Sequence, residues 1–140
     1  AEVAARDVPA TVLRFNDITE PRCGLIAPSA EMVREIIDLG GKLPADVTLL
    51  VHCFAGVSRS PAAAYALACA ASAPGDEVSI AQRLRLASPK ATPNALMVSL
   101  ADQVLRRGGA MSAAIAAIGR GADAYEGDVI DWTLEGAARA

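Results

Sequence analysis

Residues 46–61, with the sequence DVTLLVHCFAGVSRSP, carry the strongest signal of architecture in this chain. The first half, 46–53, is a nearly continuous apolar and β-branched run of strand length, which is typical of a strand buried on both faces of a parallel sheet. After a short loop, Ser60-Pro61 opens an alanine-rich run to about Ser72, which predicts a helix. The order strand, loop, helix predicts an α/β fold with a small, mainly parallel sheet flanked by helices, in which 46–53 is the central strand.

The flanking sequence extends this prediction in both directions. Residues 10–15 form a short apolar run that predicts a strand, and Asn16-Asp17 end it. Ser29 is a candidate cap for a helix over 29–39 that Gly40-Gly41 would stop. Apolar spacing and the bracketing glycines and prolines predict three further helices at 76–87, 94–105 and 110–118. Residues 128–134 fit either a strand or an ordered tail.

Composition limits the protein class. A chain of 140 residues is the common size for one domain, so we expect a single domain over 1–140. It is 53% hydrophobic but only 4% aromatic, so the core must consist of Ala, Leu, Val and Ile. A net charge of -3 argues against coating nucleic acid or anionic lipid. No apolar run approaches the roughly 18 residues that span a bilayer, so we expect neither nucleic acid nor membrane as a partner.

The cysteines indicate a reducing compartment. Cys23, Cys53 and Cys69 form an odd set without CxxC spacing, and His52 is the one histidine, so neither a disulfide scaffold nor a metal site is expected. The start of the chain shows no signal peptide, which favours the cytoplasm. Cys23 and Cys69 are most simply unreactive, and a redox pair of Cys23 with Cys53 is the lesser alternative.

The loop after Cys53 has the composition of an anion site. Backbone N–H groups in a short glycine-containing loop and the N-terminus of a helix can converge on one phosphate. The same field lowers the pKa of a thiol, Arg59 can hold two phosphate oxygens with its planar fork, and Ser60 can hydrogen-bond the sulfur. The candidate phosphate-binding residues are therefore Phe54, Ala55, Gly56, Val57, Ser58 and Arg59. Taken alone, Cys53 would be an inert small hydrophobic residue.

The spacing of Cys53, five residues, Arg59 and Ser60 resembles the signature of the cysteine-dependent protein phosphatases. The string HCFAGVSRS is similar to the HCxAGxSRS form of their dual-specificity branch, and Pro93-Asn94 resembles a segment that packs beneath the phosphate loop there. Met97 and Leu100 stand where that branch typically has Phe and Gln. FNDITEPRCGLIAP (15–28) and the helix after it are similar to the acid-bearing loop of a compact bacterial group of predicted tyrosine phosphatases. The resemblance covers about 11–120, and relative to that group the chain lacks an initial strand and helix, through truncation or a shorter natural form.

The resemblance implies a phosphatase-type phosphate loop after the central strand and hydrolysis of phosphotyrosine or dual-specificity protein substrates through a phosphocysteine. Cys53, Arg59, Asp17 and Ser60 would be catalytic, with Asp17 as general acid and then general base. Glu20, in the same loop, is the second candidate for the acid, and Asp17 could instead be only a turn residue. Asp38 and Asp46 are poorer candidates because one falls on a helix and the other at the wrong end of the central strand.

Two supporting residues and the partners follow from the same resemblance. His52 would bond backbone near the loop and steady the thiolate, with a plain core histidine as the alternative, and Asn94 would support the loop from beneath. No metal or organic cofactor is expected, since Arg59 and the loop amides would carry the charge. The partner is a phosphorylated protein or peptide, because the loop lacks the extra lysines that accompany phosphoinositide substrates.

Two other classes stay open. A rhodanese-like sulfurtransferase also has a cysteine in an anion-binding loop, but usually with a shorter spacing from Cys to Arg. A non-catalytic phosphopeptide-binding module would keep the arginine and lose the thiol or the acid, and this chain has both.

Overall fold

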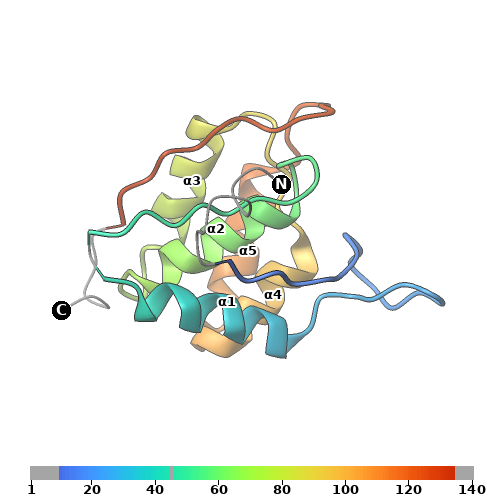
Figure 1. Cartoon of the computed structure of the whole chain (residues 1–140). Coiled ribbons are helices and arrows are strands. Elements are labelled where there is room, and N and C mark those ends of the chain that lie inside the picture. The colour runs from blue at the N-terminus through green and yellow to red at the C-terminus, as the bar shows by residue number, and fades with distance from the viewer. Residues whose placement is uncertain (1–9, 45, 135–140) are drawn as a thin grey trace.

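The structure is a computed structural model that describes residues 10–44 and 46–134. Figure 1 shows a group of helices with extended segments running past them. Within the described residues there are five helices and no strand: α1 (Ala30–Lys42), α2 (Arg59–Ala70), α3 (Glu77–Ala87), α4 (Ala95–Leu105) and α5 (Ala110–Ile118). The expectation that the chain lacks an initial strand and helix concerns the start of the chain, and residues 1–9 lie outside the described residues.

The core is built around α2. This helix packs against α1, α3 and α4, while α5 packs against α3 and α4. Alanines make up much of the buried part of α2, so its neighbours can approach its backbone closely. Tyr65, Leu84 and Met111 are the largest fully buried side chains and fill the space between the helices. Aliphatic residues make up most of the core, as expected, but Tyr65 and Met111 also belong to it, and it lies between helices.

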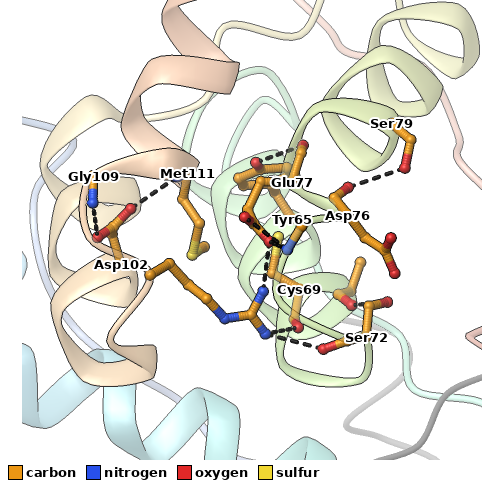
Figure 2. Close-up of polar contacts among 12 residues, drawn as sticks. Tyr65, Cys69, Ser72, Asp76, Glu77, Ser79, Asp102, Gly109 and Met111 are labelled. Carbon is orange, nitrogen blue, oxygen red and sulfur yellow. Dashed lines mark hydrogen bonds and ion pairs between the residues drawn. The ribbon is translucent and has the colours of Figure 1, made fainter.

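A buried polar cluster joins three of these helices (Figure 2). Arg107, after α4, forms an ion pair with Glu77 of α3 at 2.7 Å, and the two side chains are 5% and 7% exposed. The Arg107 guanidinium also donates to the carbonyls of Cys69 and Ser72, at 2.6 and 3.0 Å. The Tyr65 hydroxyl donates to the Glu77 carbonyl at 2.9 Å. Because every partner is satisfied, the cluster fixes the end of α2 against the start of α3.

Burial also sets the chemistry of Cys69. It raises the pKa of the Cys69 thiol to about 11, so this cysteine is a neutral thiol at neutral pH. The pKa of Tyr65 is raised as well, again mainly by burial. Both groups therefore belong to the core.

The prediction of an α/β fold is wrong, because the expected strands are extended but unpaired. Residues 48–53 make no backbone hydrogen bond with any other described residue, and neither do residues 128–134. The segment 10–15 also lies outside any ladder. A strand exists only through pairing with a neighbour, so these apolar runs give no sheet and the loop after Cys53 follows an extended segment in place of a central strand.

The helix predictions are mostly confirmed, with two corrections. The helices α3, α4 and α5 both begin and end within about one residue of their predicted limits. The Ser29 hydroxyl caps α1 by accepting from the Met32 N–H at 3.3 Å. Gly40 and Gly41 do not stop α1, which continues to Lys42. A methyl group on Gly40 would overlap the side chain of Leu67, so this glycine allows α1 to pack closely on α2. The second correction is that α2 begins at Arg59, one residue before Ser60.

None of the helices in the described ranges has the length and apolar character needed to cross a membrane.

Candidate functional site

Cys53 lies half-buried between the extended segment 46–52 and the loop that enters α2. Its sulfur accepts a hydrogen bond from the Gly56 N–H at 3.2 Å. The thiol is also 3.3 Å from the Ser60 hydroxyl, to which it donates. On ionisation the direction of this second bond reverses, because a thiolate can only accept.

The surroundings of Cys53 favour its thiolate. Partial burial acts to raise the pKa, but hydrogen bonds from the Ser60 side chain and from the Ser60 and Gly56 backbone, together with the Arg59 charge, outweigh it. The net effect lowers the pKa of the Cys53 thiol below that of an ordinary cysteine. Cys53 and Cys69 are therefore shifted in opposite directions, and Cys53 is the better nucleophile at neutral pH.

The loop carbonyls are held from outside by two other segments. Thr92 N–H donates to the Val57 carbonyl at 2.8 Å, and Asn94 N–H donates to the Ser58 carbonyl at 3.1 Å. Gly127 N–H donates to the Ala55 carbonyl at 2.7 Å. These contacts fix three carbonyl groups of the loop backbone.

Fixing the carbonyls also orients the loop amides. In a trans peptide the N–H points opposite to the preceding C=O, so outward carbonyls at 55, 57 and 58 turn the N–H groups of 56, 58 and 59 inward. Gly56, with a φ of 75°, makes the bend that this arrangement needs. Apart from the Gly56 N–H, the amides of residues 54–59 have no acceptor within the described part of the chain. A loop of this kind with a helix N-terminus behind it can bind an anion.

Arg59 links the loop to the segment before Asp17. Its Nη1 donates to the Phe15 carbonyl at 2.9 Å, and the guanidinium lies 5.9 Å from the centre of the Phe15 ring. Nε and Nη2 make no hydrogen bond to any described residue. These two donors form the fork that a bidentate contact with phosphate requires.

Asp17 is brought to the loop by two hydrogen bonds. Its Oδ1 accepts from the Ser58 hydroxyl at 2.8 Å and from Nδ2 of Asn94 at 2.7 Å. The second oxygen, Oδ2, accepts from no described residue, and the side chain is exposed. The chain thus folds so that the Asp17 carboxylate lies directly against the loop that follows Cys53.

The other acidic candidates lie differently. Glu20 is exposed and pairs with Arg22 at 3.6 Å. Asp38 is on α1, and Asp46 is the first residue of the extended segment, at the end remote from Cys53. None of these carboxylates hydrogen-bonds the loop.

Two further residues named from the sequence have no such contact. His52 is exposed and forms no side-chain hydrogen bond with the described residues. Phe54 is 97% exposed. Cys53, Gly56 and Ser60 line a groove of about 1230 Å³ between 46–56 and 126–134, so a ligand can reach the sulfur from there.

Sequence reasoning missed Gly127 and Thr92. Both act through backbone N–H groups on loop carbonyls far away in the sequence, and such contacts leave no mark on residue type at Thr92. At Gly127 the mark is the glycine itself, because a methyl group there would overlap the Gly56 carbonyl. Within the described ranges, no three His, Cys, Asp or Glu side chains gather closely enough to hold a metal ion.

Comparisons of the chain with protein-family models, with curated proteins and with solved structures found no match.

Proposed function

We propose that this protein is a phosphomonoester hydrolase that acts on phosphotyrosine or dual-specificity protein substrates through a phosphocysteine intermediate. One observation carries the proposal: the loop that donates to the Cys53 sulfur through Gly56 also donates to Asp17 through Ser58. A nucleophile, an anion-binding loop and a proton donor are the three groups that this chemistry needs.

In the first step, the Cys53 thiolate attacks phosphorus in line with the leaving oxygen. The S–P bond forms while the P–O bond to the phenol or alcohol breaks, and that oxygen takes the electron pair of the broken bond. Asp17 in its acid form gives its proton to the departing oxygen, for which Oδ2 is the available atom. The loop amides and the free Nε and Nη2 of Arg59 hold the other phosphate oxygens.

In the second step, water attacks the phosphocysteine. Asp17, now a carboxylate, takes a proton from the water as the new O–P bond forms, and the S–P bond breaks to return the thiolate and release phosphate. Ser60 and Gly56 stabilise the returning thiolate, because both can donate to the sulfur. A reducing compartment such as the cytoplasm suits this reaction, since it keeps the thiol free.

The experiment compares variants on two substrates, a phosphotyrosyl peptide and an aryl phosphate with an acidic leaving group. We expect Cys53→Ser to abolish turnover of both. Asp17→Asn should slow peptide hydrolysis roughly 10² to 10⁴-fold, the usual worth of a positioned acid, and slow the aryl phosphate much less. Glu20→Gln is the matched control, because it removes a carboxylate from the same loop without touching Ser58 or Asn94.

Three results would overturn the proposal. A turnover rate of Cys53→Ser within tenfold of the wild-type rate would show that Cys53 is not the nucleophile. Equal effects of Asp17→Asn and Glu20→Gln on the rate of peptide hydrolysis would show that Asp17 is not the general acid. Thiosulfate-to-cyanide sulfur transfer by the wild type without phosphatase activity would assign the thiol to a sulfurtransferase.

A further inference from the structure

Residues 121–128, here called the strap, cross from the segment after α3 to the loop that follows Cys53. At one end, the Gly121 N–H donates to the Thr92 hydroxyl at 2.9 Å, and the Ala122 N–H donates to the Pro89 carbonyl at 2.9 Å. At the other end, the Gly127 N–H donates to the Ala55 carbonyl at 2.7 Å. The strap is thus fixed at both ends and touches the loop at one peptide group.

A third attachment lies beside the loop contact. The Asp128 carboxylate accepts from the Ser88 hydroxyl at 2.9 Å and lies 3.8 Å from the Lys90 ammonium. Ser88 is fully buried, so this bond fixes the strap to the core beneath it. The residue next to Gly127 is therefore held in place independently of the loop.

Both contact points of the strap require glycine for reasons of space. A methyl group on Gly127 would overlap the Gly56 carbonyl oxygen, and one on Gly121 would lie 2.5 Å from the backbone of Lys90 and Ala91. Neither glycine has a positive φ, so close approach, and not backbone conformation, accounts for both. The strap can lie against the loop only because these two positions carry no side chain.

The contact acts directly on the peptide group that reaches the sulfur. The Ala55 carbonyl and the Gly56 N–H belong to one planar peptide and point in opposite directions. Gly127 holds the carbonyl outward at 2.7 Å, and the Gly56 N–H on the opposite side donates to Cys53 Sγ at 3.2 Å. Without Gly127 this peptide could rotate about its flanking bonds, and the sulfur would lose the donor.

We propose that Gly127 is a positioning residue for the nucleophile: the docked strap orients the Gly56 N–H toward the Cys53 sulfur and so sets how readily Cys53 reacts as a thiolate. This rests on the proposed role of Cys53 as the nucleophile, and it adds that the extent of strap docking controls the reactivity of the site. Because the Gly56 N–H stabilises the thiolate more than the neutral thiol, whose sulfur is a weak acceptor, its loss raises the pKa of the thiol.

The charges around Cys53 decide which variants give a clear test. Arg59 of α2 favours the thiolate, while two carboxylates of the strap, Glu126 and Asp128, line the same groove as Cys53. His52 precedes the sulfur in the chain. Substituting Asp128 would release the strap and also remove a negative charge, and these two effects on the pKa have opposite signs. Glycine substitutions change docking without changing charge.

The test is the rate of alkylation of Cys53 by iodoacetamide as a function of pH, in the full chain with Cys23→Ser. Buried Cys69 does not compete, because its pKa is raised to about 11. We expect Gly127→Ala to move the midpoint of the profile up by about one pH unit, a tenfold loss of thiolate below the midpoint. The plateau rate at high pH should stay unchanged. Gly121→Ala, which frees the other end, should move the midpoint in the same direction by less.

Gly41→Ala is the matched control, because a methyl group at Gly41 meets no atom within 4 Å and has no contact with the loop. It should leave the midpoint unchanged. If Gly127→Ala fails to fold by circular dichroism, Gly121→Ala decides the outcome. Midpoints equal to that of the control in every folded variant would overturn the proposal.

The outcome is separable from that of the proposed function. A shifted midpoint in a protein that hydrolyses no phosphomonoester would refute the function and leave the role of the strap intact. An unshifted midpoint in an active phosphatase would refute the role of the strap and leave the proposed function intact.

Discussion

Asn94 donates a hydrogen bond of 2.7 Å to Oδ1 of Asp17, a residue 77 positions earlier in the chain. The same residue donates its backbone N–H to the Ser58 carbonyl and caps α4 by accepting from the Met97 N–H at 2.9 Å. Asn94 therefore joins the start of a core helix, the loop after Cys53 and the candidate acid. Asn94 thus links the position of Asp17 to the helix packing, beside the hydrogen bond that Ser58 of the loop donates to the same oxygen.

Asn94→Ser should separate these roles. Serine is also a good helix cap, so the free energy of unfolding should stay near that of the wild type, whereas the amide donor to Asp17 is lost. We expect kcat on a phosphotyrosyl peptide to fall roughly ten- to a hundredfold, the scale of misplacing a reacting group. Steady-state kinetics and urea denaturation measure the two effects. In an Asp17→Asn background the same substitution should add almost nothing, and a full additional loss there would show that Asn94 does not act through Asp17.

Ser60→Ala should shift the pH dependence of turnover. The Ser60 hydroxyl and backbone help to lower the pKa of the Cys53 thiol, so removing the hydroxyl raises that pKa and leaves less thiolate at any pH below it. The acidic limb of kcat/KM for an aryl phosphate should therefore move to higher pH. Ser72→Ala is the control, because the Ser72 hydroxyl donates only to the Ala68 carbonyl at the far end of α2. An acidic limb that stays in place in Ser60→Ala would contradict the assignment of Ser60.

Arg107→Ala should destabilise the whole helical core. It leaves the buried Glu77 carboxylate without its partner and removes the donors to two carbonyls at the end of α2. We expect a loss of about 3–5 kcal/mol in the free energy of unfolding, measured by urea denaturation. Arg106→Ala, at the exposed neighbouring position, should change it by no more than about 0.5 kcal/mol. Equal losses in the two variants would mean that the buried pair does not stabilise the fold.

The sequence predicted those parts of the structure that depend on neighbouring residues. The helices α3, α4 and α5 follow from apolar spacing and from the glycines and prolines that bracket them, and both are local signals. Gly40 lies within a helix at a point where a methyl group would overlap Leu67, and no pattern around Gly40 contains that information. The run 46–53 has the residue types of a buried strand, but a strand also needs a partner, and the described chain supplies none.

In the candidate site, too, the sequence predicted local features and not the contacts between distant segments. The groups from Cys53 to Ser60 lie on one short loop, so their spacing predicts that they act together. The contact of Asp17 with Ser58 depends on how the chain folds back, and no pattern in the residues next to Asp17 specifies it. The hydrogen bond from Gly127 to Ala55 joins two backbones and was not foreseen at all.

The most direct test of the phosphocysteine mechanism is mass spectrometry of the wild-type chain after acid quenching within the first turnover of a phosphotyrosyl peptide. The account predicts a phosphoryl group on the proteolytic fragment that contains Cys53, bound through sulfur and absent from Cys53→Ser. Phosphate release without any adduct on Cys53, or an adduct on another residue, would contradict it.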